Sequence, residues 1–233
     1  MNYALILSGG TGLRLGAEIP KQYIEVNGKP IIAFCLEELS KHTMIDGIWI
    51  VADASWQEQL VAWIREYDVN GKFLGFSTPG ANRQLSIWNG LIDLRSKVKA
   101  EDCVFIHDAA RPLLTEDMIS SCLDAVEGHD GVLPVLPMKD TVYMSADGKS
   151  VSSLLNRSRI FAGQAPEVFR FQKYYEANER LLPDKILQIN GSTEPAIMAG
   201  MDIAMIPGDE GNFKITTKTD LEHFCEIIEK HIR

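Results

Sequence analysis

A glycine-rich turn near the N-terminus combines backbone donors with positive side chains. Residues 8–16 read SGGTGLRLG, and a second cation follows in the tripeptide Pro20-Lys21-Gln22. Glycines in such a turn let backbone N–H groups approach phosphate oxygens, and Arg14 and Lys21 add positive charge. The turn is therefore predicted to bind a triphosphate. The alternative is a tight turn beside ordinary surface charges.

Two common phosphate-binding motifs do not fit this turn. A Walker A loop ends in Gly-Lys followed by Ser or Thr, and the turn lacks that ending. The dinucleotide fingerprint requires glycine or alanine at the position of Leu15. An NAD-dependent oxidoreductase is disfavoured for this reason.

A second run with chemical potential, HDAARP at residues 107–112, directly follows a predicted buried strand. Ligands of parallel α/β sheets gather at the carboxyl ends of strands, so Asp108 is well placed to hold Mg²⁺ beside a triphosphate. Arg111 could bind a phosphate. His107 is expected to be a packed, hydrogen-bonded residue and not a catalyst.

Three further segments carry weaker signals. Residues 80–86 (GANRQLS) lead from a loop into a helix, where small and amide side chains could read a base edge or simply cap the helix. Residues 139–141 and 156–159 flank a predicted hairpin, and a solvated hairpin end is the alternative there. Lys214 lies in an apolar, strand-like stretch, where it needs an anion unless it extends to the surface.

The elements that must position these residues alternate between strands and helices. Such alternation predicts βαβ units and a mostly parallel sheet with helices on both faces. The predicted strands cover residues 3–7, 47–52, 72–77, 103–107, 131–135, 203–206 and 214–216. The predicted helices cover residues 31–40, 56–67, 82–94, 115–126 (with Thr115 as the N-cap), 171–181 and 219–232.

Residues 139–159 interrupt this alternation with a predicted β-hairpin that turns at Asp147-Gly148. A lone hairpin is unstable in water, so it is expected to pack on something, such as a second subunit. Otherwise residues 1–233 are expected to form one domain.

Composition limits the classes of function. The chain has 233 residues and a formal net charge of −9, which argues against a nucleic-acid or anionic-membrane surface. No apolar run approaches the roughly 18 residues of a membrane span. The four cysteines have no metal-ligand spacing and lie in apolar contexts, so we expect them in the core. No export signal is visible, which favours the cytoplasm.

Taken together, the glycine turn, the PKQY run at 20–23, HDAARP and the NFKITT run at 212–217 resemble the cytidylyltransferases of polyol phosphates. The resemblance implies a Rossmann-like nucleotidyltransferase fold and a homodimer joined through the hairpin arm. It also implies Mg²⁺-dependent transfer of CMP from CTP, with release of pyrophosphate. The first acceptor it suggests is 2-C-methyl-D-erythritol 4-phosphate, of isoprenoid synthesis. The alternative is ribitol 5-phosphate, for teichoic acid or capsule.

The same resemblance implies roles for individual residues. Arg14, Lys21 and Lys214 would be catalytic, and Asp108 would bind Mg²⁺. CTP would be bound along Gly9, Gly10, Gly80, Asn82, Ser86 and Ala109. The polyol phosphate would meet Arg111 and Thr193, together with Thr141 and Arg157 from the partner subunit's arm.

The sequence departs from the pattern of this family at three places. Ser8 precedes the glycine pair where alanine is usual, QAPE at 164–167 stands where TPQ is usual, and TEPA at 193–196 stands where TD(D/E)A is usual. The last two lie on the acceptor side. Another nucleotidyltransferase using UTP or GTP, and a catalytically silent nucleotide-binding module, remain as alternatives.

Overall fold

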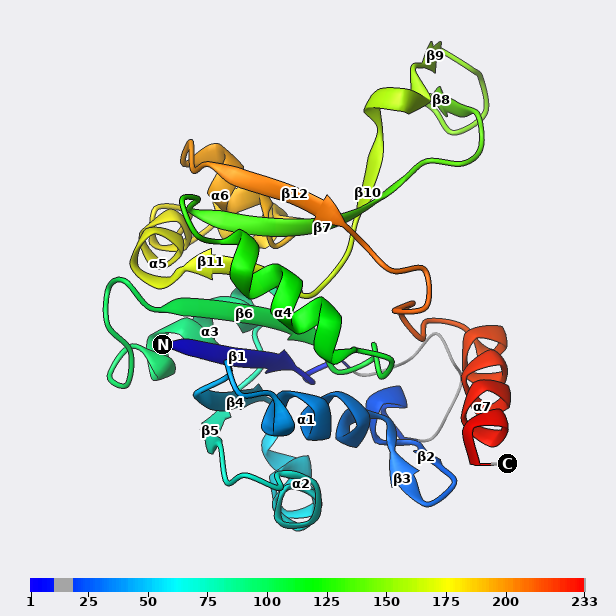
Figure 1. Cartoon of the computed structure of the whole chain (residues 1–233). Coiled ribbons are helices and arrows are strands. Elements are labelled where there is room, and N and C mark those ends of the chain that lie inside the picture. Colours follow the sequence, from blue (N-terminus) through cyan, green and yellow to red (C-terminus); the bar gives the residue numbers. More distant parts are fainter. Residues whose placement is uncertain (11–18, 233) are drawn as a thin grey trace.

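A twisted sheet of eight strands forms the centre of the molecule in the computed structural model, which describes residues 1–10 and 19–232 (Figure 1). Its main path runs β10-β7-β11-β6-β1-β4-β5, and β12 pairs with β7. The strands are β1 (Asn2–Leu7), β4 (Gly47–Val51), β5 (Phe73–Ser77), β6 (Cys103–Asp108), β7 (Gly131–Pro137), β10 (Phe161–Gly163), β11 (Glu167–Arg170) and β12 (Ile203–Pro207).

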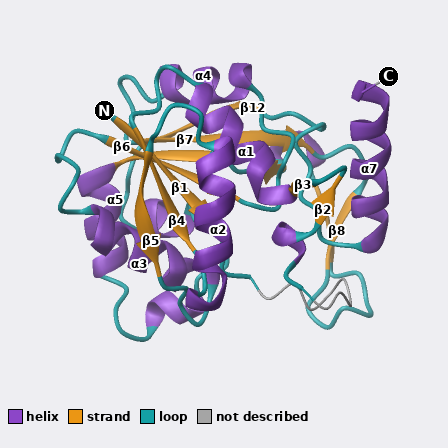
Figure 2. Ribbon diagram, turned by 90° about the horizontal axis from the view of Figure 1, so that it is seen from below, coloured by secondary structure: helices purple, strands orange, loops and turns teal. Residues whose placement is uncertain are grey.

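Helices cover both faces of the sheet, as the alternation predicted (Figure 2). Successive side chains of β1 alternate between the two layers: Ala4 and Ile6 pack with α1, α2 and α4, whereas Tyr3 and Leu5 pack with α3, α5 and α6. The helices are α1 (Ile31–Lys41), α2 (Ala54–Tyr67), α3 (Arg83–Leu94), α4 (Glu116–Ala125), α5 (Phe171–Glu179), α6 (Glu194–Met198) and α7 (Lys218–Ile232).

Helix starts follow the capping residues in the sequence. The Thr115 hydroxyl accepts a hydrogen bond from the Met118 N–H, so the predicted N-cap of α4 is confirmed. Helix α2 begins two residues before its predicted start because the Asp53 carboxylate caps it by accepting from the Ser55 N–H. Cys35, Cys103 and Cys122 are buried as expected, and Cys225 is half-buried.

The mostly parallel sheet is confirmed, but it contains two antiparallel strands that the sequence did not predict. Strand β11 runs antiparallel between β6 and β7, and β10 runs antiparallel to β7. Both are short and follow the hairpin rather than a helix, so the alternation carried no signal for them. Their importance is that β11 inserts Glu167 beside the end of β6.

The prediction of a strand at residues 214–216 was wrong. This segment is irregular, and the Ile215 N–H donates to the Ala110 carbonyl at 2.9 Å in place of a sheet partner. Ile215 is fully buried with Phe224 of α7 beside β2 (Glu25–Val26) and β3 (Lys29–Pro30). Docking of α7 therefore fixes the backbone that carries Lys214.

The predicted hairpin is confirmed and projects from the body of the molecule (Figure 1). Strands β8 (Val142–Met144) and β9 (Ser153–Leu155) pair antiparallel as a separate sheet. In the turn, the Asp147 carboxylate accepts from the N–H groups of Lys149 and Ser150, and Gly148 has a φ of 69°. Several large apolar side chains on this arm are exposed, namely Tyr143, Met144, Val151 and Leu154.

Candidate active site

The carboxylate of Asp108 lies at the carboxyl end of β6 and is surrounded by cations. Its Oδ1 accepts from Nε of Arg83 at 3.0 Å, and its Oδ2 accepts from Nζ of Lys214 at 3.0 Å. Nε of Arg111 lies 3.7 Å from Oδ2. Burial alone would raise the pKa of Asp108, but these three charges outweigh it and hold that pKa well below its ordinary value. Asp108 is therefore ionised.

Three separate elements supply these cations. Arg83 is the first residue of α3, Arg111 lies three residues after the end of β6, and Lys214 lies in the segment before α7. The Arg111 guanidinium also donates to the Asn212 carbonyl at 2.7 Å. This bond and the one from Ile215 to Ala110 tie the Lys214 segment to the end of β6.

A second buried carboxylate, Glu167 of β11, faces the same space. Its Oε1 accepts from the Thr193 hydroxyl at 2.8 Å, and its Oε2 accepts from the Ser192 hydroxyl. Arg83 donates to the Ser192 hydroxyl at 2.7 Å and lies 3.8 Å from Oε2 of Glu167. Burial raises the pKa of Glu167, and the charge of Arg83 opposes that rise. One guanidinium thus bridges two buried carboxylates.

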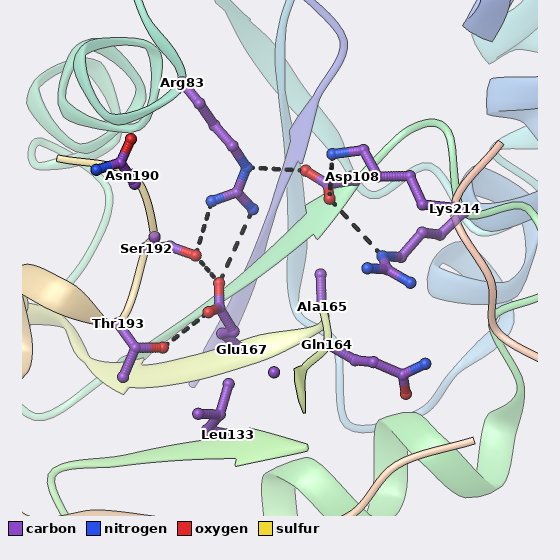
Figure 3. Close-up of a pocket in the computed structure, with 13 residues that line it drawn as sticks. Arg83, Asp108, Leu133, Gln164, Ala165, Glu167, Asn190, Ser192, Thr193 and Lys214 are labelled. Atoms are coloured by element: carbon purple, nitrogen blue, oxygen red, sulfur yellow. Dashed lines mark hydrogen bonds and ion pairs between the residues drawn. The ribbon is translucent and has the colours of Figure 1, made fainter. Parts of the chain in front are cut away.

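These groups line a cavity of about 390 Å³ (Figure 3). Figure 3 shows Arg83 between Asp108 on one side and Ser192 with Glu167 on the other. The remaining wall is formed by Leu133, Gly163, Gln164, Ala165, Asn190 and Gly191. A cavity of this size, with convergent charged groups, suits a small anionic ligand with hydroxyl groups.

Four of the predicted site residues come together here: Asp108, Arg111, Thr193 and Lys214. The hydroxyl of Thr193 is engaged by Glu167. His107 is fully buried and its Nε2 contacts the Arg111 carbonyl at 3.0 Å, which agrees with the expectation of a packed, hydrogen-bonded residue.

The predicted triphosphate segments lie next to one another. A Cβ on Gly9 would lie 2.5 Å from the side chain of Pro79, so the glycine turn and the loop after β5 touch, and only glycine fits at this contact. Nε2 of Gln22 donates to the carbonyls of Ser8 at 2.6 Å and Gly10 at 2.8 Å. These bonds hold the segment carrying Lys21 beside the turn. Arg14 lies outside the described residues.

The other predicted nucleotide contacts hold local structure. The Asn82 side chain caps α3 by accepting from the Leu85 N–H and donates to the Ile186 carbonyl. The Ser86 hydroxyl accepts from the Gly80 N–H at 2.9 Å and donates to the Asn82 carbonyl. Ala109 is fully buried, and its N–H donates to the Leu7 carbonyl.

The two arm residues do not reach the cavity of their own subunit. Thr141 and Arg157 are exposed on the hairpin arm, and neither lines the cavity. Arg157 instead donates to the Lys139 carbonyl at 2.7 Å.

Comparisons with known proteins identify the family. The family model described as "IspD: 2-C-methyl-D-erythritol 4-phosphate cytidylyltransferase" matches residues 3–230. The chain belongs to this family of cytidylyltransferases. The predicted family and the predicted nucleotidyltransferase fold are thereby confirmed.

Relatives within the family carry two different names. A Geobacter metallireducens protein named 2-C-methyl-D-erythritol 4-phosphate cytidylyltransferase is 33% identical over 94% of each chain. A Streptococcus pneumoniae protein named ribitol-5-phosphate cytidylyltransferase is 30% identical over 99% of this chain and 100% of its own. The solved Francisella tularensis 2-C-methyl-D-erythritol 4-phosphate cytidylyltransferase superposes with a TM-score of 0.80 at 26% identity, covering 96% of this chain and 97% of its own.

In this cytidylyltransferase, the Asp108 carboxylate lies beside the end of β1, the strand that leads into the glycine turn. In the described part of the chain, no three His, Cys, Asp or Glu side chains gather in a way that could hold a metal. Mg²⁺ in nucleotide enzymes often takes only one or two carboxylates, with phosphate oxygens and water as its other ligands. Asp108 fits that pattern. Within residues 1–10 and 19–232, no helix has the length and apolar character needed to cross a membrane.

Among the residues whose side chains form the ion pairs and hydrogen bonds of this cavity, Arg83, Glu167 and Ser192 were not predicted from the sequence. A signal for Arg83 was present. Cations are disfavoured in the first turn of a helix because the helix dipole is positive there. An arginine at the first position of α3 therefore needed a nearby carboxylate. Glu167 carried no such signal, because its burial results from the unpredicted strand β11.

Proposed function

We propose that this cytidylyltransferase transfers CMP from CTP to the phosphate of a polyol phosphate and releases pyrophosphate. The observation that carries this proposal is the Asp108 carboxylate, held by Arg83, Arg111 and Lys214 in a polar cavity at the carboxyl end of β6. The cavity would take the acceptor. The adjoining glycine turn would take the triphosphate.

In the proposed reaction, a phosphate oxygen of the acceptor attacks the α-phosphorus of CTP in line. A new oxygen–phosphorus bond forms, and the bond between the α-phosphorus and the bridging oxygen breaks, so that pyrophosphate leaves with the electron pair. The acceptor phosphate is already an anion, so no strong general base is required. The work of the protein is to bring two anions together and to stabilise the charge of the transition state.

The cations of the chain would bind different phosphates according to their positions. Lys214 and Arg111 face the cavity and would neutralise the acceptor phosphate. Lys21 and Arg14 belong to the triphosphate segments and would stabilise charge on the phosphoryl groups of CTP. We propose that Asp108 holds Mg²⁺ together with phosphate oxygens, and that the ion supplies further charge neutralisation when bound.

The first candidate acceptor is 2-C-methyl-D-erythritol 4-phosphate. Its support is the family model over residues 3–230 and the Geobacter relative at 33% identity. The second candidate is ribitol 5-phosphate. Its support is the set of polar side chains in the cavity wall, which suits an acceptor with hydroxyls along its length, and the relatives named for that acceptor.

The enzyme is further proposed to act as a homodimer in the cytoplasm. The exposed apolar side chains on the arm need cover, and Thr141 and Arg157 would then complete the partner's cavity. The four cysteines are free thiols, which suits a reducing compartment.

The experiment that tests this function is pyrophosphate release from CTP and Mg²⁺ with a panel of acceptors. The panel holds 2-C-methyl-D-erythritol 4-phosphate, ribitol 5-phosphate, glycerol 3-phosphate and ribulose 5-phosphate, with UTP and GTP as control donors. Turnover with CTP and one polyol phosphate is the expected result. CTP binding without pyrophosphate release from any acceptor would overturn the proposal.

A further inference from the structure

The Glu167 carboxylate occupies an unusual place in the cavity wall. It is only 7% exposed, yet it borders the cavity, and the other end of its network reaches Asp108 through Arg83 (Figure 3). A buried carboxylate costs free energy unless cations and hydrogen-bond donors compensate it. Here Arg83, Ser192 and Thr193 supply that compensation. A polar group kept in a substrate wall at such a cost suggests a role in recognition.

The two carboxylate oxygens are not equally occupied. Oε2 accepts from the Ser192 hydroxyl and faces Arg83. For Oε1, the described part of the chain records one donor, the Thr193 hydroxyl. An ionised carboxylate is a pure acceptor with about four lone-pair positions. Oε1 therefore has lone-pair positions left for one more donor, and Glu167 lines the cavity.

We propose that Glu167 is a specificity-determining residue that binds one hydroxyl of the acceptor through Oε1. This inference rests on the proposed function. A hydroxyl group can donate to the carboxylate, whereas a methyl or methylene group at the same place leaves the oxygen buried without that donor. Sites built to bind a hydroxyl reject analogues lacking it far more strongly than apolar pockets reject an added one. Glu167 would therefore select for a hydroxylated carbon at one position of the polyol.

Glu167 also stabilises the cavity wall formed by residues 191–193. Its bonds to Ser192 and Thr193 fix residues 191–193 against the cavity, and the guanidinium that compensates its charge is the one that holds Asp108. A substitution could thus act through the wall and not through a substrate contact. The test must separate these two effects.

The test combines Glu167→Gln with acceptors that lack single hydroxyls. Glutamine keeps the shape of the side chain but loses the charge and half of the acceptor capacity. With the best acceptor of the wild type, KM for the acceptor is expected to rise about 10-fold or more, as for a lost hydrogen bond to a charged group. KM for CTP should stay within about twofold. Glu179→Gln, an equal charge change on the exposed end of α5, is the matched control.

Deoxy acceptors identify the contact. One deoxy analogue should raise the wild-type KM about as much as Glu167→Gln does, and the variant should show little further loss with that analogue, because the same hydrogen bond is already missing. The other deoxy analogues should add their losses to that of the variant.

Several results would overturn the inference. They are a wild-type KM that no single deoxy analogue raises by about 10-fold, losses that add for every analogue, or a variant that changes KM for CTP as much as KM for the acceptor. The first result does not depend on whether the variant folds. Absence of wild-type turnover with every intact polyol phosphate would instead count against the proposed function, so the two failures are distinct.

Discussion

Nε of Arg83 lies 3.0 Å from Oδ1 of Asp108, although 25 residues separate them in the sequence. The contact joins the first turn of α3 to the carboxyl end of β6. The same guanidinium donates to Ser192 and lies 3.8 Å from Glu167 on the opposite side of the cavity. Arg83 therefore couples the carboxylate proposed to serve the nucleotide to the wall proposed to bind the acceptor.

Replacement of Arg83 by glutamine should impair both stability and activity. Two buried carboxylates lose a common counter-ion, which is expected to cost about 3 kcal/mol of unfolding free energy. The value of kcat/KM should fall about 10²-fold because Asp108 loses its position. Arg83→Lys should recover only part of this, since an ammonium group cannot bridge both carboxylates as a planar guanidinium does.

Urea unfolding and pyrophosphate release measure these two effects. Arg180→Gln is the control, because Arg180 is 69% exposed and lies 4.0 Å from its nearest carboxylate, that of Glu176. Wild-type kinetics in Arg83→Gln would show that the bridge between the two walls has no role in turnover.

Lys214 should be needed for turnover but not for folding. Its side chain is 35% exposed, and Arg83 and Arg111 still compensate Asp108 when it is removed. We expect Lys214→Ala to keep the melting temperature within a few degrees and to lower kcat/KM by about 10²–10³-fold. Lys218→Ala is the matched control, since Lys218 is 81% exposed at the start of α7. A fully active Lys214→Ala would remove Lys214 from the proposed mechanism.

Replacement of Asp108 by asparagine should change the dependence of the rate on Mg²⁺. The amide binds a divalent cation more weakly than a carboxylate, so half-maximal activity should require about 10-fold more Mg²⁺. The check is a magnesium titration at saturating CTP, with Asp184→Asn, at an exposed position, as the control. An unchanged titration curve would mean that Asp108 serves only to hold its three cations.

The sequence predicted the cavity residues around the end of β6 better than those that β11 brings into the wall. Asp108, Arg111 and Lys214 follow directly from a strand end and from a lysine in an apolar stretch, so local patterns located them. The wall proposed to bind the acceptor depends on β11, which enters the sheet antiparallel after the hairpin and brings Glu167 to Ser192 and Thr193. That pairing is a long-range contact, and no local pattern reports it.

Burial of His107 predicts a pH dependence of stability. Burial lowers the pKa of His107 to about 4, while the charge of Asp108 opposes the change. The unfolded chain binds this proton near pH 6.5, and the folded chain binds it only near pH 4. The contribution of His107 to the free energy of unfolding is therefore at its maximum above about pH 6.5. It falls by about 3 kcal/mol as the pH drops to 4.

The difference between wild type and His107→Gln isolates this effect. Glutamine can still donate to the Arg111 carbonyl but does not titrate. Burial raises the pKa of Glu167, so this residue lowers the free energy of unfolding as the pH rises above the ordinary pKa of glutamate. Glu167 is present in both proteins. Asp108 has a lowered pKa, so its contribution is lost only at lower pH. Urea unfolding between pH 4 and 7 should give a flatter profile for the variant. Parallel profiles would contradict the prediction.

Mixed dimers test whether the arm completes the site of the other subunit. If Arg157 acts across the interface, a subunit with Arg157→Ala keeps its own Lys214, and a partner with Lys214→Ala supplies an intact Arg157. One site in each mixed dimer is then complete. Equal, random mixing of the two subunits should give about a quarter of wild-type activity, although each variant alone is nearly inactive. Thr141→Ala in place of Arg157→Ala should behave in the same way. If the arm served its own subunit, every site would carry one of the two defects, and the mixture would be no more active than the two variants apart.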